Sequence, residues 1–331
     1  MILSLAHLAL AADHHVVRPG DTLSAIASSR GLSVEALRVA NGLAPTATPE
    51  AGTVLLVPGA PDHGRGAVCV ALTGTARALP PGGAEVPLAA GASVTAGTTV
   101  CTDADSFLTL RLPTARAGGA HDEISLVART CLTLDASSVG ADRSSLVTVT
   151  RGEVSVRAAE GDDAATVTVR TPSGVTTGER GGFRVTAEEG AARTEALHAP
   201  VEVLGGGVRR DLDAGYGSRT RTGEAPGEPV ALPPPGDPER PGHGETLLRP
   251  DFAWAPAARA LGYRIELAAS ADFSRVLLVE EVSTPSWQPE ALLLPFRVPG
   301  IWWRVSSFDR TGFLGVPSAA RPVAFPPGVG P

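Results

Sequence analysis

Residue types that commonly perform acid–base, nucleophilic or metal chemistry are few in this 331-residue chain and lie far apart. Of the seven histidines, only one belongs to a compact acidic group, His121-Asp122-Glu123. A glycine-rich, polar stretch surrounds that group, so we interpret it as a solvated turn rather than a metal site. The sequence contains neither a G-x-S-x-G nor an H-E-x-x-H motif, and the absence of lysine excludes lysine Schiff-base chemistry. These patterns predict no catalytic residue, no metal site and no cofactor, and therefore a protein that is not an enzyme.

The three cysteines, Cys69, Cys101 and Cys131, are the other candidates for chemistry. They do not form the closely spaced pairs that are typical of zinc sites. An oxidising compartment would permit one disulfide and leave one thiol over, and spacing alone does not choose the pair. We expect the Cys101–Cys131 disulfide, because both residues lie in β-like runs of one domain whereas Cys69 lies where that domain begins.

Charge and hydropathy restrict the partners and the location of the chain. The formal net charge is −7 and no basic stripe is present, so we expect no nucleic-acid partner. Residues 1–12 form an apolar run that ends in Ala9-Leu10-Ala11, which is typical of a signal peptide. A cationic leading segment is missing, so we expect the true start to lie upstream of Met1; the alternative is a short buried segment leading into the first domain.

No other stretch reaches the ~18 apolar residues that a membrane span requires. We therefore expect an exported protein in the periplasm or cell envelope, with no transmembrane segment in its mature chain.

Local signals near the N-terminus predict a strand, two helices and a second strand. Asp21 or Thr22 can cap the first helix. Ser33 can cap the second helix, which Asn41-Gly42 would end. Residues 54–58, V-L-L-V-P, form the closing strand.

Three segments of this region, V-R-P-G-D-T-L-S-A-I-A, L-S-V-E-A-L-R-V-A-N-G-L and G-T-V-L-L-V-P, resemble a LysM domain over residues 14–58. The resemblance implies a small βααβ fold that binds polymers containing N-acetylglucosamine, such as peptidoglycan. It also implies a shallow groove between the loop before the first helix and the loop after the second. In this chain the groove residues would be Gly20, Asp21, Thr22 and Leu23 in the first loop, and Asn41, Gly42 and Leu43 in the second.

The chemistry of an N-acetyl group suits these residue types. The group has an amide donor, a carbonyl acceptor and a methyl, so backbone groups at a glycine turn can pair with the amide while Leu23 receives the methyl. The alternative, that Gly20, Asp21 and Thr22 only form a turn and a cap, is compatible with this role. Residues 44–50 lack the bulky aliphatic that family members carry there, and no second copy is present to add avidity. We therefore expect weak binding.

Residues 68–218 contain short β-branched runs separated by glycine, which predict an all-β sandwich, roll or solenoid. Val147–Thr150 and Val154–Val156 flank Arg151-Gly152-Glu153 as in a hairpin. The runs R-G-E-V-S-V (151–156) and R-G-G-F-R-V (180–185), with G-A-S-V-T-A-G-T-T-V-C-T (91–102), resemble a FecR-type domain. That resemblance implies a periplasmic module that contacts an unidentified envelope protein, although the membrane helix and cytoplasmic portion of classical members are missing.

Residues 219–246 are rich in proline and glycine and predict an extended linker. Residues 248–326 follow, and their W-x-P, G-Y-R-I-E-L-A and P-G-I-W-W-R-V segments resemble a fibronectin type III-like β-sandwich. All four tryptophans of the chain lie in this last part, so we expect it to fold around its own core. Trp254, Tyr263 and one of Trp302 and Trp303 are predicted core residues, because adjacent residues of a strand face opposite ways.

The alternation also places Arg264, Glu266 and Arg304 on the outer face of this sandwich. Altogether the sequence predicts a multi-domain, mainly β protein: a LysM module, a FecR-like roll or solenoid, and a fibronectin III-like sandwich. We expect a non-enzymatic cell-envelope protein that binds peptidoglycan. The alternative is a periplasmic sensor or regulator in which the FecR-like domain relays signals through a partner.

Overall fold

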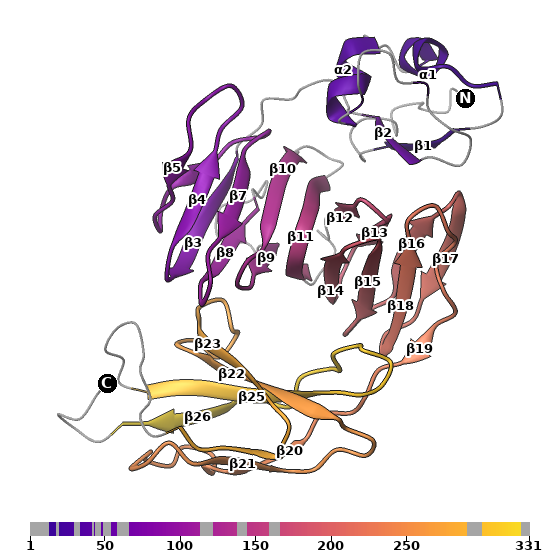
Figure 1. The fold of residues 1–331 in the computed structure, drawn as a ribbon. Helices are drawn as coiled ribbons and strands as arrows, with labels where there is room; N and C mark the ends of the chain where they lie inside the picture. Colours follow the sequence, from indigo (N-terminus) through magenta and orange to yellow (C-terminus); the bar gives the residue numbers. More distant parts are fainter. Residues whose placement is uncertain are drawn as a thin grey trace, which may run out of the picture.

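The computed structural model describes residues 13–17, 20–29, 34–41, 43, 48, 54–57, 66–112, 122–137, 144–158, 166–289 and 300–325. The predicted signal segment 1–12 lies outside these residues. The described chain is mainly β, with a small helical module at the N-terminus followed by two β domains (Figure 1). None of its described helices has the length and apolar character needed to cross a membrane.

The N-terminal module has the predicted order of elements. Strand β1 (Asp13–Val16) pairs antiparallel with β2 (Val54–Val57), and between them lie α1 (Leu23–Ser29) and α2 (Val34–Ala40). The side chains that form its buried core are Val17, Leu23, Ile26, Ala27, Leu37 and Leu55. Helix α1 places Leu23, Ile26 and Ala27 on one face, and this face contributes to the buried cluster.

The middle domain consists of strands β3 to β19, which form one hydrogen-bonded sheet arranged in two layers. The first layer contains, in order, β6 (Ser93–Val94), β3 (Ala67–Thr73), β8 (Phe107–Arg111), β9 (Glu123–Leu126), the second half of β11 (Ser144–Ala158), β14 (Gly181–Glu188), β15 (Ala191–Ala196), β18 (Tyr216–Arg221) and β19 (Val230–Ala231). The second layer contains β5 (Val86–Pro87), β4 (Ala76–Leu79), β7 (Thr99–Thr102), β10 (Cys131–Ser137), the first half of β11, β12 (Thr166–Thr171), β13 (Gly174–Gly178), β16 (Val201–Gly205) and β17 (Val208–Leu212).

Strand β11 joins the two layers, and the hairpin predicted around Arg151-Gly152-Glu153 is wrong. The chain continues as one strand whose first half pairs with β10 and β12 and whose second half pairs with β9 and β14. Gly152 has φ +86° at the crossing point, and a Cβ there would lie 2.6 Å from the Cα of Thr130. The glycine signals a change of layer rather than a reversal of direction.

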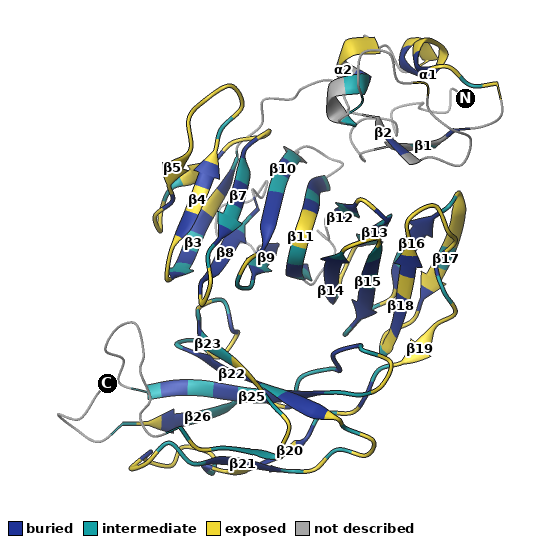
Figure 2. Ribbon diagram, viewed as in Figure 1, coloured by how far each residue is buried: buried dark blue, intermediate teal, exposed yellow. Residues whose placement is uncertain are grey.

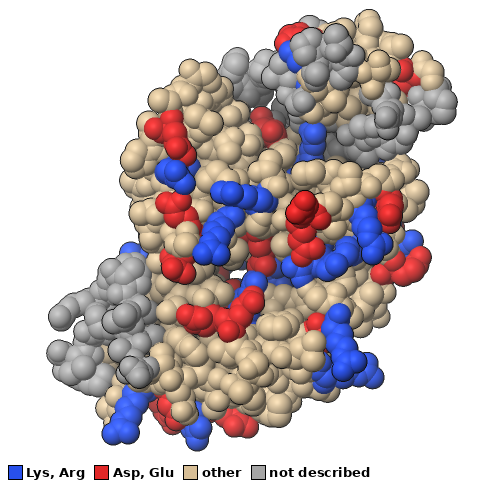
Figure 3. Space-filling view, viewed as in Figure 1, with Lys and Arg blue, Asp and Glu red and all other residues tan. Residues whose placement is uncertain are grey.

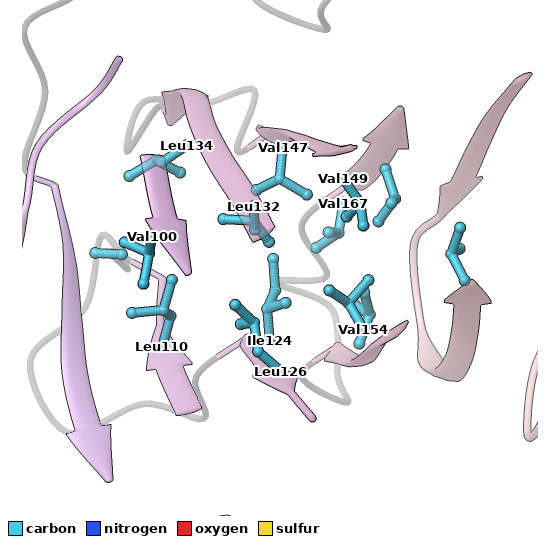
Figure 4. Packing of buried hydrophobic residues seen from close by; sticks show 14 of the residues in the cluster. Val100, Leu110, Ile124, Leu126, Leu132, Leu134, Val147, Val149, Val154 and Val167 are labelled. Atoms are coloured by element: carbon cyan, nitrogen blue, oxygen red, sulfur yellow. The ribbon is translucent and has the colours of Figure 1, made fainter. Parts of the chain in front are cut away.

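An aliphatic core fills the space between the two layers (Figure 4). Leu132, Val147 and Val149 come from the second layer, and Ile124 and Val154 come from the first. All five are fully buried because period-two alternation directs one side of each layer inward (Figure 2).

The disulfide of the structure joins Cys101 of β7 to Cys131 of β10, which are directly opposed in the antiparallel register. The third cysteine, Cys69, is a buried thiol on β3. Burial raises the pKa of this thiol to about 11, so it remains protonated near neutral pH.

The C-terminal domain is a sandwich of two sheets. One contains β20 (Asp237–Arg240), β21 (Phe252–Ala255) and β24 (Ser286–Trp287); the other contains β23 (Val276–Val282), β22 (Gly262–Ala268), β25 (Gly300–Phe308) and β26 (Arg321–Ala324). Its core is aromatic: the ring centroids of Trp254 and Tyr263 lie 5.4 Å apart, as do those of Phe252 and Trp303. Trp303 is buried and Trp302 is half-buried, which confirms that only one of the pair points inward.

Residues 219–246 do not form the extended linker that was predicted. Residues 219–221 belong to β18, residues 230–231 form β19, and residues 237–240 form β20, which pairs with β21 of the sandwich. The proline-rich sequence is compatible with strands here because β19 and β20 lie at the edges of their sheets. The segment therefore attaches one β domain directly to the other.

Buried charges hold the two β domains together. Arg264 of β22 donates a hydrogen bond of 2.6 Å to the carboxylate of Glu153 on β11. Arg184 of β14 contacts the same carboxylate at 3.3 Å and donates to the carbonyl oxygen of Leu314. The amide of Leu314 in turn donates to the carboxylate of Glu195. Since Glu153, Arg184 and Glu195 are all buried, this contact is an interior feature rather than a surface one.

The outward placement of Arg264, Glu266 and Arg304 is correct for the sandwich alone but wrong for the whole chain. Glu266 is only 8% exposed, and it accepts a hydrogen bond of 2.5 Å from Arg304. These side chains do point away from the aromatic core. The middle domain covers the surface to which they point, because Arg264 reaches Glu153 across the interface.

Candidate glycan-binding site

The first loop of the N-terminal module is held by two side-chain contacts. Gly20 has φ +92° and is exposed, so this turn requires glycine. The next residue, Asp21, lies 2.5 Å from Nε2 of His15 on β1, which connects the loop to the sheet. Thr22 accepts a hydrogen bond of 3.1 Å from the amide of Ala25 and so caps α1. The sequence indicated the turn and the cap but not the partner His15.

The second loop begins at the end of α2. The side chain of Asn41 donates to the carbonyl oxygen of Leu37, one turn earlier, with a distance of 2.6 Å. The amide of Leu43 donates to the carbonyl oxygen of Arg38, and the Arg38 guanidinium donates back to the carbonyl oxygen of Leu43 at 2.5 Å. Glu35 fixes the same guanidinium through its carboxylate. Arg38 was not among the predicted site residues, and no motif distinguished it from an ordinary surface arginine.

The two loops meet at the core of the module through leucine side chains. Leu23 is 8% exposed and belongs to the buried cluster, while Leu43 is partly buried and packs against that cluster. Leu23, predicted to receive the acetyl methyl, is therefore a core residue in this structure. Gly42 lies outside the described residues.

The arrangement offers a partly apolar surface between two polar turns. Leu43 supplies the accessible aliphatic part, and the exposed turn at Gly20 and Thr22 supplies backbone groups. Asp21 and Asn41 are both half-buried and already contact their own module. Such a surface is suited to binding a neutral amide-bearing ligand.

The acidic residues next to His121 are not a solvated turn. Asp122 and Glu123 are both buried, and Glu123 on β9 pairs with Arg111 at 3.1 Å and with Arg157. His121 itself lies outside the described residues. Within the part of the chain that the structure describes, no group of three histidine, cysteine or acidic side chains could hold a metal ion.

Comparison with known proteins supports the assignment of the N-terminal module. A family model described as the LysM domain matches residues 15–58. LysM is a binding domain, and the match supports glycan binding by this part of the chain. No curated protein matches the chain.

Two crystal structures of a protein described as an anti-sigma factor from Parabacteroides distasonis ATCC 8503 are similar to part of the chain. Their sequence identities are 17% and 16%, and the TM-score is 0.32 for each. Each comparison covers 40% of this chain and 57% of that chain, so the match spans little more than half the length of those structures.

Proposed function

We propose that this protein is a non-enzymatic component of the bacterial cell envelope that binds peptidoglycan through its N-terminal module. The LysM match over residues 15–58 carries the proposal. The geometry of the module supports it, because specific hydrogen bonds hold Asp21 and Thr22 before α1 and hold Asn41 and Leu43 after α2. In this role the exposed turn at Gly20 pairs with the N-acetyl amide, and Leu43 contacts the methyl.

An exported, periplasmic or envelope location fits the disulfide of the middle domain. Disulfides persist in oxidising compartments and are rare in the reducing cytosol. The Cys101–Cys131 bond therefore supports the same location as the signal-like residues 1–12. The two β domains behind the module would contact a second envelope protein.

Sedimentation of the full-length protein with purified sacculi tests the peptidoglycan assignment. Leu43→Ala should reduce the bound fraction about three- to tenfold, since about 1 kcal/mol of apolar contact is lost. Val34→Ala is the matched control, because Val34 is an aliphatic residue of the same module that is 41% exposed on α2. Equal binding by both variants and the unaltered protein would contradict the assignment of the loop. The absence of sedimentation by the unaltered protein would contradict the function itself.

A regulatory role is the second candidate, and one structural observation favours it. The C-terminal domain covers a polar face of the middle sheet through the buried pair of Arg264 and Glu153. Opening this contact would expose a surface for a partner that relays a signal. Crosslinks to an envelope protein that appear only in Glu153→Ala would support relay, whereas identical crosslinks in both proteins would support a scaffold.

A further inference from the structure

A cavity of about 580 Å3 lies between the middle domain and the C-terminal sandwich. It is separate from the LysM module, and it adjoins the charged contact around Glu153, because Arg184 lines the cavity and also pairs with Glu153. Figure 3 shows acidic and basic side chains gathered along the junction of the two β domains, which is hollowed between them. The volume falls within the ~300–1,000 Å3 that is usual for small-molecule sites.

Contacts between the domains flank the cavity on two sides. On one side Thr73 of β3 donates a hydrogen bond of 2.6 Å to the carbonyl oxygen of Val276, and Arg157 donates to the carbonyl oxygen of Asp272 at 2.7 Å. On the other side are the contacts of Arg184 and Glu153 with the sandwich. The cavity is therefore built by both domains and is not a gap at a free edge.

Short hydroxyl side chains and a glycine form the floor of the cavity. Thr109, Ser125, Ser155 and Arg184 are directly opposed in register across β8, β9, β11 and β14, so they form one row on the same face. The hydroxyls of Thr109 and Ser125 lie 3.0 Å apart. Gly182 lines the same floor from β14 without a side chain. The sheet thus presents hydroxyl groups and leaves room above them.

The charged side chains around the cavity neutralise one another. They comprise three arginines and three carboxylates: Arg157, Arg184, Arg304, Glu123, Glu266 and Asp272. Arg157 pairs with Glu123 and Asp272, Arg304 pairs with Glu266, and Arg184 pairs with Glu153 and Glu195 nearby. An ionic ligand would gain no uncompensated partner among these groups, and its own desolvation would oppose binding. A neutral ligand can instead form charge-assisted hydrogen bonds with them.

Apolar side chains supply the remaining wall and roof. The cavity is lined by Phe107 of β8, by Val276 and Val279 of β23, and by Phe273. The guanidinium carbon of Arg304 lies 3.9 Å from the centroid of the Phe273 ring and covers it. The cavity thus has hydroxyls and paired charges on one side and C–H surfaces on the other. This distribution is complementary to a molecule with hydroxyl groups at its edges and apolar faces. Sugar rings have this distribution.

We propose that this cavity binds a neutral saccharide of one or two rings, which contacts both β domains at once. The hydroxyl row of Ser125 and Ser155 would accept and donate hydrogen bonds to ring hydroxyls, and Val279 would pack on a ring face. The site is independent of the LysM groove, so peptidoglycan binding by the module neither requires nor implies it. A bound sugar would also stabilise the closed arrangement of the two domains, because it would bind only while they are together.

Isothermal titration of the full-length protein with N,N′-diacetylchitobiose tests the proposal. Ser155→Leu from the floor and Val279→Phe from the roof should each weaken the cavity's binding at least tenfold by filling it. The matched control is Ser93→Leu, since Ser93 is an exposed serine on strand β6 of the same layer. Leu43→Ala should weaken the LysM contribution to the titration about three- to tenfold, and it lies outside the cavity lining, so it identifies which part of the titration belongs to the module. Two variants from different domains are used because either substitution alone could impair folding.

Three results would overturn the proposal. The first is unchanged binding in both folded cavity variants. The second is a weakening of the whole titration by Leu43→Ala alone, which would place the sugar only on the LysM module. The third concerns charge: glucose 6-phosphate, an anionic sugar, should bind at least tenfold more weakly than chitobiose, and equal or tighter binding would contradict a neutral ligand. Failure of sacculus sedimentation would leave these outcomes unaffected, because that assay reads the module and not the cavity.

Discussion

The N-terminal module and the C-terminal sandwich are stabilised in different ways. The buried cluster of the module consists entirely of residues between Val17 and Leu55, and its loops are fixed by contacts such as that of Arg38 with Leu43. The sandwich also has its own aromatic core, yet it shares buried charges with the middle domain through Arg264. Among the described residues, the contacts that stabilise the module lie within its own sequence, whereas the sandwich and the middle domain stabilise one another.

This difference determines which part of the chain a local motif can identify and which parts depend on each other for stability. A module whose contacts are local can be identified by a short motif and can fold wherever it is placed. A buried ion pair between domains is sensitive to the loss of either partner, because the remaining charge stays in a desolvated interior. The two β domains should therefore respond as one unit to changes on either side of their interface, while the module should not.

Removing the shared carboxylate should have the largest effect. Glu153→Ala leaves Arg184 and Arg264 without their partner and should lower the free energy of unfolding of the two β domains by about 3–5 kcal/mol. Urea denaturation followed by tryptophan fluorescence measures this loss of stability. All four tryptophans lie in the sandwich and Glu153 lies in the middle domain, so a shifted transition shows that the effect crosses the interface.

An exposed ion pair of the middle domain provides the control for Glu153→Ala. Arg77 lies 2.8 Å from Asp103, with side chains 48% and 40% exposed, and Arg77→Ala should leave the tryptophan transition where it is. If Glu153→Ala also left it unchanged, the sandwich would be an independent unit like the module.

The sequence predicted the local elements better than the relation between the domains. The order of elements in the module, and the rule that only one of Trp302 and Trp303 points inward, followed from capping and alternation, which depend on neighbours in sequence. Alternation also correctly turned Arg264 away from the sandwich core, but it could not reveal what covers the other face. The burial of that face depends on the contact between Arg264 of β22 and Glu153 of β11, and these strands are more than a hundred residues apart in the sequence.

For the groove residues too, the sequence predicted local features but not packing between distant segments. Thr22 was recognised as a cap because capping is local, whereas Leu23 was assigned to the ligand although it packs into the core. A leucine at the start of a helix is compatible with either position, and only packing against Leu37 and Leu55 decides between them. Arg38 was missed because its function depends on the loop that returns to it.

Loss of the disulfide should have the next largest effect. Cys101→Ser together with Cys131→Ser opens a link between residues 30 apart and should lower the free energy of unfolding by about 2–4 kcal/mol. If the β domains form one unit, the tryptophan-reported transition should shift although both cysteines lie in the middle domain. Non-reducing peptide mapping should recover the Cys101–Cys131 linkage with Cys69 as a thiol, and a bridge containing Cys69 would refute this pairing.

The interface should also weaken as the pH rises through neutrality. Burial raises the pKa of Glu195 to about 7; Arg184 opposes this rise and Glu153 adds to it. The folded state therefore holds a proton between about pH 4.5 and 7 that the unfolded state has released, and this contribution to stability is lost as the pH rises through that window. The loss should be on the order of 2 kcal/mol between pH 5 and 8.

Glu195→Gln isolates this carboxyl group, because a neutral amide should remove most of the pH dependence in that window. Asp135, whose pKa burial raises to about 6, contributes with the same sign at lower pH and remains in the variant. Burial alone would raise the pKa of Glu153, but Arg264 and Arg184 outweigh it and the pKa is lowered, so its contribution is lost only in acid. Identical pH profiles for Glu195→Gln and the unaltered protein would contradict the assignment.

The smallest expected effect tests the separateness of the module. Thr22→Ala removes the hydroxyl that accepts a hydrogen bond from the amide of Ala25, and loss of such a cap costs about 1 kcal/mol. Hydrogen exchange at the amides of α1 should accelerate about fivefold, and Ser24→Ala, at an exposed position of the same helix, should leave it unchanged. The tryptophan-reported unfolding of the sandwich should stay the same in both variants, because the contacts that fix this loop lie within the module. A shift of that transition in Thr22→Ala would show that the module is coupled to the β domains, and the contrast between local and shared stabilisation would then fail.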